Sequence, residues 1–400
     1  MHIVHVEDHF LPTSGYQINF LTKWHVYHGH KATIVTSKSL RPWTSKGFIN
    51  EEFEKQIEVY DRKFTEETGV KVIRLPTLGS VSSRQIFYPN IFKIVENLRP
   101  DVVMVHGNDT LTGMRFICKS AKLKYPLIFD NHMAEVASEN RFNNQFRWFY
   151  RNFITPIIKK RHLTVVALAD DVKRYCMTHY NIPENLLPVV SWGVDTSLFK
   201  PSFSARRRFR EKYNINENDF VCIYTGKISL DKKVHLLAQA FVEKFNVEKN
   251  VVLIVVGSGS GEYYEKTKKL FEKSNNRIIM FPTVPMTDLP QFYQAADLAI
   301  WPGACSLSFF DAQATGLPVI AEDIEANRVR ITPERANGFL YSVDDWHALR
   351  ECIYTCLGLS STELRKIGEN GRAFVTENYS YDKVTREIEN IMLQILRCAN

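Results

Sequence analysis

Two lysines flank a short polar segment in GKISLDKKVHLLAQAF (226–241). Gly226 ends a predicted strand, and Lys227 and Lys232 lie on either side of a loop that leads into a predicted helix. The first N–H groups of a helix are unpaired and carry partial positive charge, so ammonium groups beside them suit a diphosphate. Solvated surface lysines are the alternative interpretation of this loop taken alone.

A single carboxylate, Asp311, lies among small and apolar residues in GACSLSFFDAQATGLPVIAED (303–323). We predict a helix from Ser308 through Thr315 that Gly316 closes. Ser308 and Asp311 have the spacing of a capping box, in which the carboxylate reaches back to a backbone N–H. Alternatively, Asp311 accepts hydrogen bonds from sugar hydroxyls, and the preceding backbone amides point at an anion. These amides belong to Cys305, Ser306 and Leu307.

Three segments of the first half also carry ligand-type residues. Gly15, in FLPTSGYQINF (10–20), lies between a predicted strand and a helix, where a missing Cβ lets a phosphate approach the backbone. HGND (106–109) and DNHMAE (130–135) each place a histidine at the end of a predicted strand. A lone histidine is usually structural, but two on neighbouring loops favour a shared site.

The elements that position these residues alternate between short apolar runs and amphipathic stretches, which is typical of a parallel sheet wound by helices. A helix follows the first strand and ends at Gly29, and residues 43–68 are predicted to be helix or loop. Predicted strands are 2–6, 31–37, 70–76, 101–107, 125–132 and 163–169, then 220–227, 250–259, 277–282, 296–302 and 317–323. Ligands of such sheets bind beyond the carboxyl ends of the strands, where the residues above are found.

Length and composition indicate a soluble protein of two domains. Its 400 residues exceed one usual core, and the apolar stretch 295–321 is broken by prolines, glycines and aspartates. The seven cysteines do not show the spacing of metal ligands, and Cys352 and Cys356 are expected to be buried free thiols. Free thiols indicate a reducing compartment. A net charge of +7 favours anionic partners only weakly, and we interpret the arginine run 206–210 as a solvated linker face. No nucleic-acid-binding signature is present.

The motifs occur together in an order that resembles the family-4 retaining glycosyltransferases. VVSWGVDTSLFKP (189–201) is the most specific string. GKISLDK, DVVMVH, PLIFDNH, VVALADDVKRYC, the base-lining segment 281–302 and NGFLY (337–341) are also similar to that family. The resemblance implies an α/β protein of the GT-B fold, with two Rossmann-like doubly wound domains facing a cleft. Residues 1–198 would bind the acceptor and 199–380 the nucleotide-sugar donor, and the helix 381–400 would pack back on the first domain.

The resemblance implies transfer of a sugar from a nucleotide diphosphate-sugar to an acceptor hydroxyl, with retention and without metal or other cofactor. His132, Lys232 and Lys227 would be catalytic. The donor-binding residues would be Gly15, Gly226, Val284, Cys305, Ser306, Leu307, Ser308 and Asp311. The acceptor-side candidates are Tyr16, His106 and Asn108.

One departure concerns the family's E-x7-E motif. Its second glutamate falls on Asp311, but its first falls on Gly303, which has no side chain. Backbone amides of residues 304–307 would then bind the donor sugar, or Glu322 or Glu325 would substitute. The remaining alternatives are a different donor sugar or impaired catalysis.

The acceptor is expected to be a saccharide or a lipid-linked saccharide. The aromatic and basic segment 141–162 is an amphipathic helix that meets an anionic membrane, or an ordinary helix with Phe149, Phe153 and Ile157 inward. We expect a cytoplasmic protein, with the inner membrane face as a candidate location. A nucleotide-sugar epimerase of the same fold and a non-catalytic nucleotide-sugar-binding relative are the alternative functions.

Overall fold

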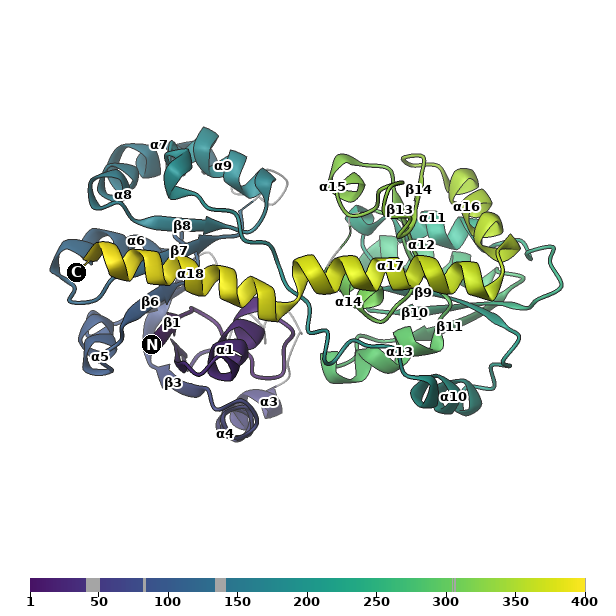
Figure 1. The fold of residues 1–400 in the computed structure, drawn as a ribbon, viewed down its shortest axis with the longest axis horizontal. Helices are drawn as coiled ribbons and strands as arrows, with labels where there is room; N and C mark the ends of the chain where they lie inside the picture. The colour runs from purple at the N-terminus through teal and green to yellow at the C-terminus, as the bar shows by residue number, and fades with distance from the viewer. Residues whose placement is uncertain (41–50, 82–83, 134–141, 304, 306, 400) are drawn as a thin grey trace. The chain divides into compact units, whose positions relative to one another are not determined.

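The computed structural model describes residues 1–40, 51–81, 84–133, 142–303, 305 and 307–399, which form two compact units (Figure 1). The first unit comprises Met1–Trp192 together with Asp382–Asn400, and the second comprises Gly193–Tyr381. The first stretch therefore ends at Trp192, before the boundary expected after residue 198. The return of the chain's last segment to the first unit has the topology expected of the GT-B fold.

The first unit is built on a parallel sheet of six strands in the order β3-β2-β1-β6-β7-β8. The strands are β1 His2–Val6, β2 Lys31–Ser37, β3 Lys71–Leu75, β6 Val102–Val105, β7 Leu127–Asn131 and β8 Thr164–Ala167. All four residues of β6 and all five of β7 are buried, because helices cover both faces of such a sheet. The six predicted strands are confirmed, with slightly different ends.

The hairpin of β4 Thr77–Val81 and β5 Arg84–Phe87 was not predicted, because its short polar strands lack an apolar signal. The first unit's helices include α1 Gln17–Tyr27, α3 Glu51–Lys55, α4 Ile57–Thr68, α5 Ile91–Asn97, α6 Leu111–Lys119 and α9 Asp170–Tyr180. Helices α3 and α4 confirm the prediction for the described part of 43–68; residues 43–50 lie outside the described residues.

Helix α18 (Tyr381–Ala399) packs on the first sheet's core (Figure 1). Val384, Ile388 and Met392 recur every four residues and are fully buried in one cluster with Ile3 and Met104. Polar contacts add to this packing. Glu389 accepts hydrogen bonds from His25 Nδ1 at 2.7 Å and from His28 Nδ1 at 2.9 Å, and the other nitrogen of His28 lies 2.7 Å from Asp382.

The second unit has a parallel sheet of six strands in the order β11-β10-β9-β12-β13-β14. The strands are β9 Phe220–Thr225, β10 Val251–Val256, β11 Arg277–Phe281, β12 Leu298–Trp301, β13 Val319–Glu322 and β14 Phe339–Tyr341. Its helices include α10 Phe203–Lys212, α11 Val234–Ala240, α12 Gly261–Glu272, α13 Leu289–Ala295, α14 Ser308–Ala314, α15 Glu325–Arg328, α16 Trp346–Gly358 and α17 Ser361–Tyr379. The five strands predicted for this half are confirmed. In α16, Cys356 is buried and Cys352 is half-buried, and both are free thiols.

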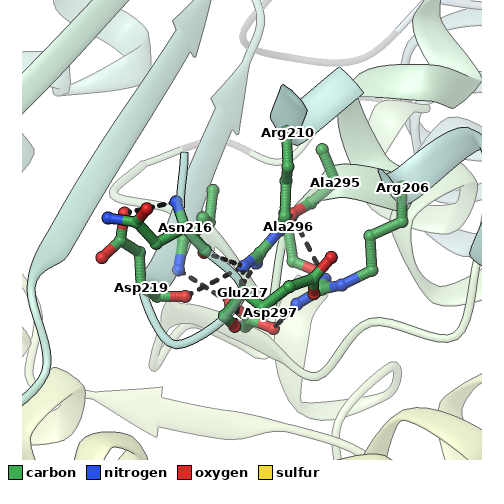
Figure 2. A network of polar contacts seen from close by, with 9 residues as sticks. Arg206, Arg210, Asn216, Glu217, Asp219, Ala295, Ala296 and Asp297 are labelled. Carbon is green, nitrogen blue, oxygen red and sulfur yellow. Dashed lines mark hydrogen bonds and ion pairs between the residues drawn. The ribbon is translucent and has the colours of Figure 1, made fainter. Parts of the chain in front are cut away.

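The arginine run on α10 is not simply a solvated face, because two of its members bind the second sheet (Figure 2). Arg210 is only 1% exposed, and its guanidinium donates to the carbonyls of Asn216 and Asp219 and to the Asp297 carboxylate. Arg206 donates to the same carboxylate at 2.7 Å. This network fixes α10 to the amino-terminal edge of the sheet; the other two arginines, Arg207 and Arg208, remain exposed.

The segment containing Gly193 and Asp195 crosses the junction between α17 and α18. Val194 pairs with Ser380, and its N–H donates to the Tyr379 carbonyl at 2.8 Å. A Cβ on Gly193 would lie 2.6 Å from the Tyr381 ring, so only glycine permits this approach. Asp195 Oδ1 accepts hydrogen bonds from the Ser197 backbone N–H and hydroxyl, which holds the turn that follows.

The aromatic segment forms α7 Asn143–Phe149, the π-helical turn Tyr150–Ile154 and α8 Thr155–Arg161. Tyr150, Ile154 and Ile158 face the core at helical spacing. Phe149 is 40% exposed and Phe153 is 54% exposed. The ordinary helix with both of these phenylalanines inward is therefore wrong, because the buried stripe is displaced by one residue.

Candidate active site

In the first unit, the carboxyl ends of β1, β6 and β7 bring together two predicted residues and two that were not predicted. These three strands are neighbours in the sheet, so the side chains that end them meet. His106 Nδ1 lies 2.5 Å from Asp130 Oδ2, and His132 Nε2 lies 3.3 Å from the same oxygen. On the other side, His106 Nε2 lies 3.0 Å from His5 Nδ1. His5 and Asp130 were missed because both lie within apolar strand patterns.

The charges of this group follow from its burial and contacts. Although burial opposes ionisation, His106 and His132 hold the pKa of Asp130 well below its ordinary value. Burial also acts against a charged His106, but Asp130 raises the pKa of its imidazole. Burial, together with His106 and His25, lowers the pKa of His5 well below its ordinary value. These three pKa shifts agree with one arrangement, in which a His106 imidazolium lies between the Asp130 carboxylate and a neutral His5 imidazole.

The predicted acceptor-side residue Asn108 is fully buried next to this group. Its amide N donates to the Tyr150 hydroxyl at 2.7 Å, and its amide O accepts from Asn131 Nδ2 at 2.5 Å. Asn131 Oδ1 in turn accepts the Met133 backbone N–H at 2.8 Å. Asn108 therefore holds the Asn131 side chain, which in turn binds the Met133 backbone N–H.

The glycine loop before α1 is held by a residue that sequence reasoning missed. Asn19 is 5% exposed, and its amide N donates to the carbonyls of Leu11 and Pro12. Its amide O accepts the Ser14 hydroxyl at 3.1 Å. These bonds fix the backbone immediately before Gly15. The predicted Tyr16 follows, with 49% of its side chain exposed.

In the second unit, the lysine loop joins β9 to α11 as predicted, but the three lysines 227, 232 and 233 have different environments. Lys227 is exposed, and no described residue pairs with its ammonium group. The Lys232 side chain is 20% exposed, and its ammonium lies 3.8 Å from Asp231. Lys233, which was not predicted, has a positive φ of 49° and binds Glu322 at 2.6 Å and Asp344 at 2.7 Å.

Gly226 and Gly257 let the ends of β9 and β10 meet closely. A Cβ on Gly257 would lie 1.9 Å from the Gly226 carbonyl oxygen, and Gly226 itself has a φ of 147°. The two turns therefore approach each other at backbone distance. The predicted Gly226 owes its position to this packing, independently of any ligand.

Gly303 lies against the backbone of the lysine loop. A Cβ at this position would be 2.8 Å from the Lys232 carbonyl carbon and 2.9 Å from the Asp231 carbonyl oxygen. Backbone atoms cannot swing aside, so an acidic side chain is excluded unless one of the loops moves. The missing acid is thus explained by packing: the lysine loop occupies its space.

The two acids considered as substitutes have different environments. Glu322 is 2% exposed, and one of its oxygens accepts both the Lys233 ammonium and the Asp344 backbone N–H. Glu322 is thus committed to the lysine loop. Glu325 is exposed at the start of α15. Residues 304 and 306 lie outside the described residues. The structure therefore does not test the predicted role of Ser306 or of the backbone amides of these two residues.

Asp311 lies in the first turn of α14, as predicted, but the capping box is wrong. The helix begins after Leu307 without a side-chain cap, and among the described residues none forms a hydrogen bond with the Asp311 carboxylate. The side chain is only 5% exposed. Burial, and secondarily the nearby Asp195, raises the pKa of Asp311 well above its ordinary value.

The other predicted donor-side residues lie near Asp311 or at the edge of the core. The Ser308 hydroxyl donates to the Thr225 carbonyl at 3.3 Å, which connects α14 to the end of β9. Burial raises the pKa of the Cys305 thiol to about 11, despite nearby Arg330. Leu307 and Val284 are half-buried. A cavity of about 830 Å³ lies at the opposite edge of this sheet, beside Phe220 and Asp297.

Comparisons with known proteins agree with this architecture. Residues 14–198 match the family described as Glycosyltransferase Family 4, and residues 205–374 match Glycosyl transferases group 1. An uncharacterized glycosyltransferase of Methanocaldococcus jannaschii is 26% identical, over 86% of this chain and 89% of that protein. The capsular polysaccharide biosynthesis glycosyltransferase CapM of Staphylococcus aureus is 26% identical, over 63% of this chain and 67% of its own. The Anabaena protein HepE, solved with UDP and glucose, superposes with a TM-score of 0.71 at 18% identity, over 98% of this chain and all of that chain.

Two six-stranded parallel sheets with polar residues gathered at their carboxyl edges define a GT-B protein. The matches then identify its class as a glycosyltransferase. The chain belongs to the group in which a Glycosyltransferase Family 4 half is followed by a Glycosyl transferases group 1 half. Within the part of the chain that the structure describes, no helix is both long enough and apolar enough to span a membrane.

Proposed function

We propose that this glycosyltransferase moves a sugar from a nucleotide diphosphate-sugar to an acceptor hydroxyl, with retention of anomeric configuration, in glycan assembly. The observation that carries this proposal is the set of groups at the carboxyl edge of the second sheet. Lys227 and Lys232 offer positive charge in a loop that Gly303 contacts, and Asp311 offers a carboxyl group to which no described residue donates a hydrogen bond.

In the proposed reaction, the leaving group is a nucleoside diphosphate, so catalysis requires stabilisation of the negative charge that develops on phosphate. Lys227 and Lys232 supply this charge, together with the backbone N–H groups of Cys305, Leu307 and Ser308. No metal ion is required for this step. Asp311 accepts hydrogen bonds from the ribose diol, which supplies the donors that the described residues do not give to its buried carboxylate.

His132 is proposed to contact a hydroxyl of the transferred sugar. Its side chain is 39% exposed, whereas the other members of its cluster are almost fully buried. The ring of Trp192 lies edge-on to the imidazole at 5.2 Å, which restricts its rotation. Tyr16 and His106 are the acceptor-side candidates that remain near this edge of the first sheet.

The similar proteins support a nucleotide-sugar donor and a role in glycan assembly. HepE was solved with UDP and glucose, and CapM is named for capsular polysaccharide biosynthesis. We therefore propose a saccharide or lipid-linked saccharide as the acceptor, in polysaccharide, lipopolysaccharide or glycoconjugate assembly.

A panel of nucleotide sugars tests the proposal. Slow donor hydrolysis without acceptor, and transfer with a suitable acceptor, are expected of a transferase. A changed sugar would identify an epimerase, and binding without turnover would identify a binding protein. The anomeric coupling constant of the product, measured by NMR, decides between retention and inversion.

We also propose that the α7–α8 segment contacts an anionic membrane. Phe142, Trp148 and Phe153 are 65%, 63% and 54% exposed, and Trp148 and Phe153 contact each other. The exposed cations Lys159, Lys160 and Arg161 follow on α8. Aromatic and basic side chains together suit the interface of an anionic bilayer, and a protein bound there acts at the inner face of the cytoplasmic membrane.

Vesicle co-sedimentation tests this contact. Binding to vesicles that contain phosphatidylglycerol is expected to exceed binding to pure phosphatidylcholine, and to fall with added salt and in a Trp148→Ser, Phe153→Ser variant. Equal recovery with both vesicle types, or no effect of the double substitution, would contradict it. Val59→Ser, at a 59% exposed apolar residue on α4, is the matched control.

A further inference from the structure

The segments that follow β12 and β13 meet at the carboxyl edge of the second sheet, where Cys305 lies. These two strands are parallel neighbours, so the residues after their ends come close together. Burial raises the pKa of the Cys305 thiol to about 11. The side chains of Arg330 and Asn327 lie beside this thiol, Lys232 lies near it, and all three act against the shift. The lysine loop and the segment after β13 therefore approach Cys305 from different parts of the chain.

Arg330 carries a positive charge that no described carboxylate pairs with. Its guanidinium lies 5.1 Å from the centre of the Phe310 ring and 5.7 Å from that of the Phe309 ring, both in the first turn of α14. Aromatic rings attract a cation without neutralising it, and Arg330 forms no ion pair within the part of the chain that the structure describes. An arginine side chain stays protonated in proteins, so this charge does not depend on the titration of a neighbour.

The acids of the neighbouring segments do not balance this charge. Other cations lie beside them: Lys233 binds Glu322 and Asp344, Arg328 binds Asp323 and lies near Glu325, Lys232 lies near Asp231, and Arg335 lies near Glu334. Burial, and secondarily Asp195, raises the pKa of Asp311 well above its ordinary value. A cation paired with Asp311 would lower that pKa, so Arg330 does not neutralise it. The charge of Arg330 is therefore available to an anionic ligand.

Asn327 adds a neutral acceptor at the same place. Its side chain is only 1% exposed, and its Nδ2 donates to the Glu322 carbonyl at 2.8 Å. No described group donates a hydrogen bond to its Oδ1. A buried carbonyl oxygen without a donor is unfavourable, and a hydroxyl group of a ligand would supply the missing hydrogen bond.

We propose that Arg330 and Asn327 select a donor whose transferred sugar bears a carboxylate: Arg330 binds the carboxylate, and Asn327 accepts a hydrogen bond from a hydroxyl of the same sugar. The planar guanidinium matches a carboxylate with two parallel hydrogen bonds. Gly303 fits this assignment, because an acidic side chain beside the lysine loop would repel the carboxylate. The proposal rests on the proposed function in one respect: Lys232 must bind the diphosphate, which places the sugar near Cys305.

Nucleotide sugars that differ only at C6 test this selection. The pairs are UDP-glucuronate with UDP-glucose, UDP-galacturonate with UDP-galactose, and GDP-mannuronate with GDP-mannose. Isothermal titration calorimetry measures the Kd of each, and of UDP and GDP alone. In at least one pair, the uronate is expected to bind about 10- to 100-fold more tightly than the neutral sugar nucleotide, as a charge-assisted pair of hydrogen bonds requires. Equal or weaker binding of the uronate in every pair would overturn the proposal.

Variants of Arg330 locate the preference. Arg330→Gln is expected to reduce the ratio of the two affinities to less than about threefold, and to change the affinity for the nucleoside diphosphate alone by less than about threefold. Arg330→Lys keeps the charge without the planar fork and should retain an intermediate preference. Arg328→Gln removes an exposed arginine of the same segment, which pairs with Asp323, and is the matched control that should leave the ratio unchanged. A full preference in Arg330→Gln would overturn the proposal.

The competing explanations give different results. If Arg330 only supports α14 through its aromatic contacts, Arg330→Gln lowers Tm and leaves the preference intact. If Arg330 binds the diphosphate, the same variant weakens UDP or GDP alone as much as the sugar nucleotide. Either result overturns this proposal and leaves the proposed function standing, whereas a wild-type protein that binds no nucleoside diphosphate overturns both. If Arg330→Gln does not fold, the wild-type preference and Arg330→Lys decide.

Discussion

The Lys233 ammonium lies 2.6 Å from the Glu322 carboxylate, which is almost completely buried at the end of β13. This ion pair connects the lysine loop to the neighbouring part of the sheet. It also distinguishes Lys233 from the adjacent Lys232, whose ammonium lies 3.8 Å from the Asp231 carboxylate. Of two consecutive lysines, one holds the loop and the other is proposed to bind phosphate.

Lys233→Met is therefore expected to lower stability more than activity. Removing one partner of a fully buried pair costs roughly 3–5 kcal/mol, and the partial exposure of Lys233 reduces this to about 1–3 kcal/mol. Urea unfolding measures the change in the free energy of unfolding. Lys232→Met is the matched control, and a larger stability loss in Lys232→Met than in Lys233→Met would contradict the assignment.

Lys232→Ala is expected to lower kcat/KM by about 10- to 100-fold, since a charge-assisted hydrogen bond to a phosphate contributes roughly 1.5–3 kcal/mol. Steady-state kinetics with the preferred donor measures this loss. Lys269→Ala, at an exposed lysine on α12, should retain wild-type turnover. Equal kinetics for Lys232→Ala and the wild type would exclude its proposed role.

Gly303→Ala is expected to destabilise the second unit or to displace the lysine loop, because the new Cβ would meet backbone atoms at 2.8 Å. Overpacking of this kind costs roughly 1–3 kcal/mol. Thermal unfolding and the affinity for the nucleoside diphosphate report the two effects. Gly358→Ala, where a Cβ meets nothing within 4 Å at the end of α16, is the control and should be neutral or slightly stabilising.

Asp311→Asn is expected to raise the free energy of unfolding at neutral pH while weakening donor binding. The folded protein raises the pKa of this carboxyl well above its ordinary value of 3.8, so ionisation costs stability as the pH rises above that value. The stability gain of the variant should disappear below pH about 4, where the carboxyl is protonated in both states. Urea unfolding at pH 7 and at pH 4 tests the sign, and a gain that persists at pH 4 would contradict it.

Removal of divalent metal is expected to leave transfer unchanged, because the proposed reaction stabilises phosphate charge with lysines and backbone N–H groups. Activity after dialysis against EDTA, compared with activity after readdition of Mg²⁺ or Mn²⁺, measures this. A loss that Mn²⁺ restores would show that a metal ion takes part in the phosphate step.

The alternation of apolar and amphipathic segments was sufficient to predict eleven strands, because strands buried on both faces are nearly continuous apolar runs. The short edge strand β14 and the β4–β5 hairpin lack that signal. The motif order likewise placed Lys227, Lys232, Asp311 and His132 at strand ends, since loops follow strands in the sequence itself.

The sequence by itself determined which residues end each strand and hence which carry chemistry. Only the tertiary structure decided how they pair. His5, His106 and Asp130 lie far apart in the sequence and meet because β1, β6 and β7 are adjacent in the sheet. Contact between segments depends on strand order and packing. For the same reason the sequence does not explain the missing acid at Gly303, whereas the structure shows the lysine loop against this position.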